Sequence, residues 1–219
     1  MQRQKLTLAC WLTLICCASV WAELPAQGPQ LRGVWSPKVG GGAVYEIHHP
    51  QHGKTQFEFA VVGEEKVVGK TAYWVEMRMT QSEEGRLVIK SLVVFEAQKP
   101  DVLRMIMQSG DEPPMEIPVL MQRNTSQPGG PVPQDIRAVA EHLGTETVTT
   151  PAGSFTCDHF RMKDGTADVW ISQQVAPYGI VKMTGRDGSM TLLKLLEGER
   201  SQIRSEPQKM PLMPGLPPP

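Results

Sequence analysis

Apolar and polar side chains alternate with a period of two along most of the chain. In residues 71–80, Tyr73 and Val75 would share one face of a strand. Trp74 and Glu76 would share the opposite face. Glycine, proline and aspartate separate such segments at short intervals, which is typical of hairpin turns. The segments with this pattern are residues 43–49, 56–62, 71–80, 87–95, 102–108, 115–119, 146–150, 156–163, 167–172, 180–184 and 190–197.

These short segments favour antiparallel strands, because parallel strands would need crossover helices for which the connections leave no room. We therefore expect a mainly β (α+β) protein, with a curved antiparallel half-barrel sheet of about 11 strands and one or two covering helices. Residues 133–143 have helical spacing and are followed by Gly144, so they predict a helix. Its apolar positions are Ile136, Val139, Ala140 and Leu143.

The first residues have the three parts of a secretory signal peptide. A basic start with Arg3 and Lys5 precedes a short apolar run from Leu6 to Ala18 and a Val20-Trp21-Ala22 ending. We expect cleavage near Ala22 and a periplasmic or secreted mature protein. The expected divisions of the chain are a signal peptide (1–22), an irregular lead-in (23–40), a β domain (41–200) and a proline-rich disordered tail (201–219).

Charge and cysteine content limit the candidate partners. Removing residues 1–22 leaves 197 of the 219 residues and changes the formal net charge from −1 to −3. A weak negative charge gives no broad attraction to phosphate backbones, so we expect no nucleic-acid partner. Cys157 then remains as a single thiol, which cannot form an internal disulfide and is interpreted as a buried structural cysteine.

A histidine cluster is the one candidate metal site. His48, His49 and His52 lie close to Glu46, and such side chains bind zinc or copper. Consecutive strand residues point to opposite faces, however, and Pro50 interrupts the backbone before His52. The sequence contains no phosphate-binding glycine loop, dinucleotide fingerprint or nucleophile elbow. We therefore predict no cofactor and no catalytic residue, and expect a protein that is not an enzyme.

Methionines are frequent in the predicted strands, whereas aromatic residues are few. Flexible thioether side chains adapt to irregular apolar partners, so a methionine-lined concave surface is suited to an acyl chain or a hydrophobic peptide. The alternative interpretation is that methionine fills the core. The candidate cavity residues are Met77, Met79, Met105, Met107, Trp74 and Trp170.

Two stretches of the chain carry recognisable motifs. The first stretch runs from Val61-Val62-Gly63 through Tyr73-Trp74-Val75-Glu76 to Met115-Glu116-Ile117-Pro118. The second includes Pro151-Ala152-Gly153-Ser154-Phe155, Asp168-Val169-Trp170-Ile171-Ser172 and Pro177-Tyr178-Gly179-Ile180-Val181-Lys182. Both stretches resemble a group of largely uncharacterised secreted bacterial proteins related to the lipoprotein-carrier (LolA/LolB-like) superfamily. The resemblance implies that residues 41–200 form a half-barrel sheet, closed by helices, over an apolar interior that receives lipid acyl chains in the carriers.

Three functions are compatible with these patterns. The leading hypothesis is a non-enzymatic periplasmic or envelope protein that binds a lipid, a lipoprotein or another apolar ligand, with peripheral contact to the envelope. The second is a metal-binding protein or metal-dependent hydrolase that uses His48, His49 and His52. The third is a structural interaction module whose proline-rich tail binds a partner.

Overall fold

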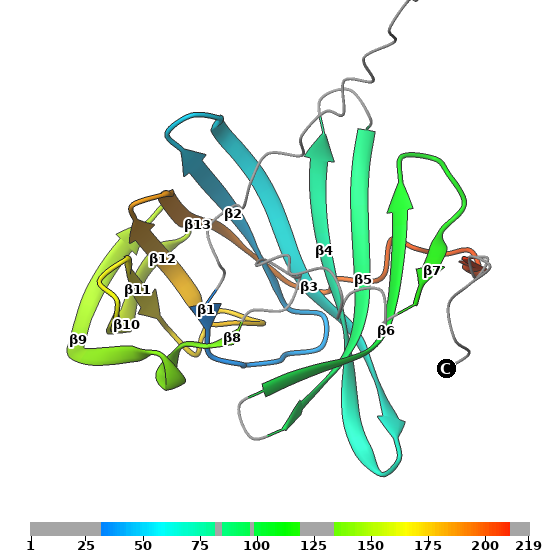
Figure 1. Cartoon of the computed structure of the whole chain (residues 1–219), viewed down its shortest axis with the longest axis horizontal. Coiled ribbons are helices and arrows are strands. Elements are labelled where there is room, and N and C mark those ends of the chain that lie inside the picture. Colours follow the sequence, from blue (N-terminus) through cyan, green and yellow to red (C-terminus); the bar gives the residue numbers. More distant parts are fainter. Residues whose placement is uncertain (1–31, 82–84, 97–98, 119–133, 211–219) are drawn as a thin grey trace, which may run out of the picture.

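The regular structure of the protein is almost entirely β-strand (Figure 1). The computed structural model describes residues 32–81, 85–96, 99–118 and 134–210. No helix in these ranges is long and apolar enough to cross a membrane. The elements are β1 (Arg32–Gly33), β2 (Gly42–His49), β3 (Gly53–Val67), β4 (Lys70–Gln81), β5 (Gly85–Glu96), β6 (Lys99–Ser109), β7 (Met115–Ile117), β8 (Gln134–Asp135), a 3₁₀ turn η1 (Ile136–Ala138), β9 (Ala140–Thr150), β10 (Gly153–Met162), β11 (Ala167–Ile171), β12 (Ile180–Gly185), β13 (Gly188–Leu196) and β14 (Gln208–Lys209).

Twelve of the strands form one sheet in the order β14-β7-β6-β5-β4-β3-β2-β13-β12-β11-β10-β9. Every neighbouring pair is antiparallel except β14 and β7. The sheet consists of two meanders that are joined where β2 pairs with β13. The half with β9–β13 curls over, which brings β9 into contact with β12 and β13 (Figure 1). The predicted mainly β class and the single curved antiparallel sheet are therefore confirmed.

The predicted helix at residues 133–143 is wrong. Only one helical turn forms, in which the Asp135 carboxylate accepts a hydrogen bond from the backbone N–H of Arg137 at 2.9 Å. From Ala140 onward the backbone pairs with β10 instead, so tertiary pairing overrides the local helical pattern. Gly144 has a φ of 134° and lies where the β9–β10 register shifts, so it marks a bulge and does not end a helix. The described residues contain no α-helix that covers the sheet.

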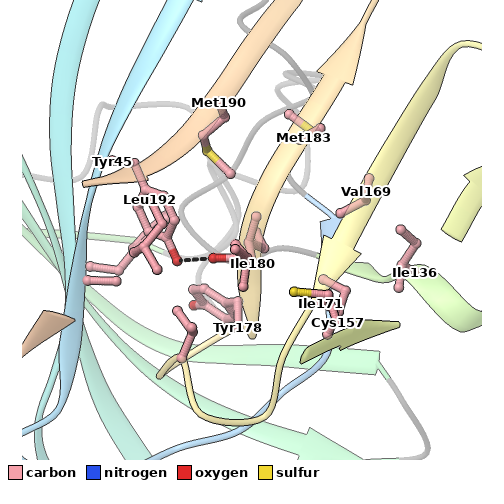
Figure 2. Close-up of a cluster of buried hydrophobic side chains, with 14 of the residues drawn as sticks. Tyr45, Ile136, Cys157, Val169, Ile171, Tyr178, Ile180, Met183, Met190 and Leu192 are labelled. Atoms are coloured by element: carbon pink, nitrogen blue, oxygen red, sulfur yellow. Dashed lines mark hydrogen bonds between the residues drawn. The ribbon is translucent and has the colours of Figure 1, made fainter. Parts of the chain in front are cut away.

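The main core lies inside the curled half of the sheet (Figure 2). Tyr45 of β2 is fully buried there, and its hydroxyl donates a hydrogen bond to the carbonyl of Ile180 at 3.0 Å. This bond satisfies the one polar atom of a large apolar side chain. The other core side chains in Figure 2 come from five further elements and one connecting loop. Those labelled are Ile136, Cys157, Val169, Ile171, Tyr178, Ile180, Met183, Met190 and Leu192.

The lead-in before β2 closes one end of this interior. Trp35 stacks on Phe95 of β5, with ring centroids 4.0 Å apart, and contacts Tyr178 and Tyr73 edge-on or at a tilt. Residues 34–38 have no regular structure. They are nevertheless fixed in place by Trp35, because the stacking of its ring on Phe95 stabilises the segment in addition to the burial of the ring.

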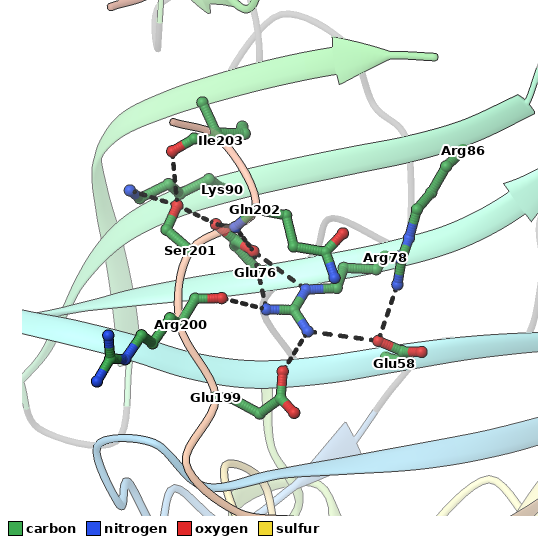
Figure 3. Close-up of polar contacts among 10 residues, drawn as sticks. All are labelled: Glu58, Glu76, Arg78, Arg86, Lys90, Glu199, Arg200, Ser201, Gln202 and Ile203. Atoms are coloured by element: carbon green, nitrogen blue, oxygen red, sulfur yellow. Dashed lines mark hydrogen bonds and ion pairs between the residues drawn. The ribbon is translucent and has the colours of Figure 1, made fainter. Parts of the chain in front are cut away.

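A carboxyl-terminal strap, residues 199–210, crosses the other face of strands β4–β7 (Figure 3). Its position depends on Arg78 and Glu76 of β4, whose side chains are 1% and 0% exposed. Arg78 Nη2 lies 3.0 Å from Glu76 Oε2. Glu199 forms an ion pair with Arg78. The guanidinium of Arg78 also donates a hydrogen bond to the backbone carbonyl of Arg200 at 2.9 Å. Buried charges are tolerated only when they are paired and hydrogen-bonded, and the strap supplies these partners.

The strap also satisfies Glu76. This carboxylate accepts hydrogen bonds from the hydroxyl of Ser201 and from the backbone N–H of Gln202. Ile203 then packs with Val88 and Ile106. The prediction of a disordered tail is thus wrong for residues 201–210, because their polar groups complete a buried ion cluster. Residues 1–31, which include the expected signal peptide, and residues 211–219 lie outside the described ranges.

The ion cluster leads to a stability prediction. Arg78→Met should lower the free energy of unfolding by about 3–5 kcal/mol, because it leaves Glu76 buried without its counter-charge. Arg86→Met is the matched control. Arg86 binds the same Glu58 carboxylate as Arg78, at 3.1 Å, but is 42% exposed, so its loss should cost less than about 1 kcal/mol. Urea unfolding of both variants measures the two free energies of unfolding. Equal losses in the two variants would contradict the role of Arg78 in the buried ion cluster.

Candidate functional site

The face of β4–β7 that the strap does not cover is apolar and rich in methionine. Cross-strand partners in an antiparallel sheet point to the same face, so the register defines which side chains share it. The first row is Val61, Val75, Ser91, Met105 and Ile117. The second row is Phe59, Met77, Ile89, Met107 and Met115, and the third is Phe57, Met79, Leu87 and Ser109. We call these three rows the methionine face.

The methionine face is divided between core and surface. Val75 belongs to the main core, and Met77 and Met79 pack against it while staying partly exposed. The cover decreases along β6, from Met105 at 6% exposure to Met107 at 36%. None of the residues in the three rows carries a charge. The surface therefore consists of flexible apolar side chains with nothing ionic to fix a charged ligand.

The structure places four of the six predicted cavity residues together. Met77, Met79, Met105 and Met107 all lie on the methionine face, on β4 and β6. Both strands pair with β5. The sequence signal that placed the four methionines on one face was the period-two alternation of side chains within each strand.

Trp74 does not belong to this group, because its position in β4 has the opposite parity. It lies on the strap side, where Lys90 and Arg104 are 4.8 Å and 5.5 Å from its ring. Its indole N–H donates to Glu65 at 3.2 Å. A ring between two cations stabilises the outer surface and does not line the apolar face.

Trp170 lies on β11, and four strands of the sheet lie between β11 and β4. Its ring stacks on His159 with centroids 4.5 Å apart, and Lys182 lies 5.2 Å from it. The indole N–H donates to Glu146, which also contacts His159. The two tryptophans thus lie outside the three rows of the methionine face, and the predicted cavity stays a prediction.

The histidine cluster lies at the β2–β3 hairpin and does not converge on a metal site. The rings of His49 and His52 lie 4.5 Å apart, and His49 Nδ1 accepts a hydrogen bond from the backbone N–H of Gln51 at 3.1 Å. Glu46 is paired with Lys54 at 2.9 Å, and His48 is exposed. Over the residues that the structure covers, no group of three or more histidine, cysteine or acidic side chains is arranged to hold a metal.

Ser91 is the residue of this face that the sequence analysis missed. Its side chain lies between Val75 and Met105 and is 1% exposed. Its hydroxyl is the single buried side-chain polar atom without a hydrogen-bond partner in the described structure. The signal was present in the pattern of β5, where a polar residue occupies an inward position among Leu87, Ile89 and Val93. Such an orphan group costs about 1–3 kcal/mol, so it needs an explanation.

The class of protein follows from this arrangement: one open β-sheet with a methionine-rich apolar side and an ion cluster on its other side. Over residues 51–202 the sequence matches the family described as "Domain of unknown function (DUF4412)", and the chain belongs to this family. No curated protein matches the chain.

Two solved structures are similar to it. One, from Bacteroides fragilis NCTC 9343, is described as "a putative exported protein with YmcC-like fold"; its TM-score is 0.36 at 13% identity, over 76% of this chain and 100% of that chain. The other, from Parabacteroides distasonis ATCC 8503, is described as "a putative lipoprotein"; its TM-score is 0.37 at 13% identity, over 75% of this chain and 99% of that chain. The relation to the lipoprotein-carrier superfamily stays a prediction.

The thiol of Cys157 is expected to be inert. Burial, together with the nearby carboxylates of Asp158 and Glu146, raises its pKa to about 11. At pH 8 about one thiol in a thousand is then ionised, against about a quarter in the unfolded chain. The mature protein should therefore react with Ellman's reagent at least about a hundredfold more slowly than the same protein in 8 M urea. Comparable rates in the two states would show that the thiol is accessible and ionised.

Proposed function

We propose that the protein is a non-enzymatic envelope protein that binds the acyl chain of a lipid or lipoprotein on the methionine face. The observation that carries the proposal is the exposure of Met107, with Ile89 and Met115 partly exposed beside it in the second row. A contiguous apolar surface on a soluble protein marks an interaction site more often than a defect of packing. The expected signal peptide supports a location outside the cytoplasm.

The composition of the face fits an acyl chain in particular. Met77, Met79 and Met107 can change rotamer to follow a flexible chain, which a rigid aromatic or branched surface cannot do. Each CH₂ group removed from water contributes about 0.8 kcal/mol, so a chain of about 12 methylenes gains about 10 kcal/mol before the cost of association. Because the face carries no charged side chain, binding of an acyl chain does not require the desolvation of an ion.

The metal alternative has no comparable support. Glu46 already has a cationic partner in Lys54, and the histidines at this hairpin do not converge. The third hypothesis, a partner for the proline-rich tail, concerns residues 211–219 and stays a prediction.

A single charge should abolish ligand binding. Met107→Lys places an ammonium group in the exposed part of the methionine face, and the affinity for a fluorescent acyl-chain probe should fall at least about tenfold, because the charge must be desolvated against the chain. Leu195→Lys on β13 is the matched control, since Leu195 is also 36% exposed and lies in the other half of the sheet.

The test combines probe titration with mass spectrometry of gently purified protein. The wild type and Leu195→Lys should bind the probe and carry co-purified lipid, and Met107→Lys should do neither. If the wild type neither binds the probe nor carries lipid, the proposed function is wrong. If Met107→Lys binds as well as the control, the ligand lies elsewhere.

A further inference from the structure

One edge of the sheet is open. Strand β9 is the last of the twelve strands and, among the described residues, pairs with β10 alone (Figure 1). Its segment 145–150 pairs with β10 in regular register, and four of these six residues are exposed. A strand edge of this kind presents backbone groups to which a further strand can add.

The register shows which backbone groups of β9 point outward. Thr150 and Gly153 face each other across a two-residue turn, and such a pair exchanges both of its hydrogen bonds. Hydrogen-bonded and open pairs then alternate along the antiparallel ladder, so every second residue of β9 directs its N–H and C=O groups away from β10. These outward-directed residues are Thr145, Thr147 and Thr149.

The opposite edge of the sheet is protected. There β7 has three residues and lies between Pro114 and Pro118, and β14, which covers it, has two residues and ends in Lys209. Short strands, prolines and lysines are the features with which β-proteins prevent pairing at an edge. The segment 145–150 contains neither proline nor lysine. The two edges therefore differ in just the features that decide whether another strand can add.

A second copy of the chain has the groups that this edge needs. In an antiparallel pair related by a two-fold axis, each outward N–H faces a C=O of the same strand in the other copy, so the strand complements itself. An axis at Thr147, the centre of 145–149, places threonines opposite threonines and leaves the bulge at Gly144 at the end of the paired segment. Glu146 then lies opposite Val148 of the second copy, so no carboxylates oppose each other.

An exposed leucine supports the same register. Leu143 is 44% exposed and lies in β9 beside this segment. With the axis at Thr147, it lies opposite Pro151 in the turn of the second copy, so the pairing brings two apolar side chains together. Because the other edge of the sheet is protected, pairing at β9 ends with two copies and does not continue into a fibre.

We propose that the protein forms a symmetric dimer in which β9 pairs antiparallel with β9 of a second copy, about a two-fold axis at Thr147. The two sheets then continue into one. The methionine face lies on β3–β7, at the other end of the strand order, so the dimer does not use it. The inference is therefore independent of the proposed function, and its test needs no ligand.

Sedimentation velocity measures the dimer directly. The mature protein should show a monomer–dimer equilibrium between about 1 µM and about 1 mM. Thr147→Lys should weaken the dimer at least about tenfold, because it places two ammonium groups opposite each other at the axis.

Thr156→Lys is the matched control. Thr156 is the cross-strand partner of Thr147 on β10 and is also exposed. The same charge then lies one strand inside the edge, more than a Debye length from its copy at physiological salt, and should change the dimerisation constant less than about twofold.

Cysteine substitutions test the register. Thr147→Cys brings two thiols together at the axis, where the Cα atoms of a hydrogen-bonded pair lie about 5.5 Å apart, so mild oxidation should link the two copies. Thr156→Cys should stay unlinked, because its two Cα atoms are separated by three strand spacings of about 4.8 Å each. The native Cys157 is buried and should not take part.

The outcomes that would overturn the inference are distinct. A wild type that stays monomeric throughout this range would leave the edge to a strand of another protein. Equal weakening by Thr147→Lys and Thr156→Lys would place the dimer contact elsewhere on the surface. A dimer whose Thr147→Cys variant does not cross-link would exclude the axis at this residue. All four variants should keep the circular dichroism spectrum and the melting temperature of the wild type, because the substituted side chains are exposed.

Discussion

The buried ion pair between Arg78 and Glu76 is the interaction on which the arrangement of the whole sheet depends. Two charges in the middle of a strand are expensive unless every polar atom finds a partner, and neighbouring strands alone do not provide enough of them. The strap supplies Glu199, the carbonyl of Arg200 and the N–H of Gln202. One face of β4 is thereby closed by polar contacts from the same chain, and the opposite face is left apolar and partly open.

The same alternation explains how much of the molecule could be predicted from its sequence. The residues of β4 were assigned correctly to two faces, and the methionines at positions 77 and 79 do share a surface with those at 105 and 107. Trp74 was included in the ligand site, although its own parity places it with Arg78. Periodicity identifies the faces of a strand, but it does not tell which face will be covered by a distant segment.

The errors at residues 133–143 and 201–210 have a common physical origin. Both segments take their structure from partners that lie far away in the sequence: Ala140 pairs with Met162, and Ser201 binds Glu76. Local spacing around Ile136 is compatible with a helix, and the residues after Glu199 contain few apolar side chains. Tertiary pairing decides both cases, since neither segment has strong local preferences of its own. Ser91 was missed for a related reason, because one polar residue in an apolar row is unremarkable until its lack of a partner is known.

The pairing of β2 with β13 has a consequence for the order in which the chain can assemble. Strands β2–β7 are contiguous in sequence and can form hairpins as soon as they are synthesised. The charges on β4, however, wait for residues about 120 positions further on, and β2 waits for a strand near the end of the chain. Such long-range closure is slow, and an incomplete sheet exposes both an unpaired strand edge and an uncompensated ion pair. A chain that emerges amino terminus first therefore exposes these groups until β13 and the strap are free.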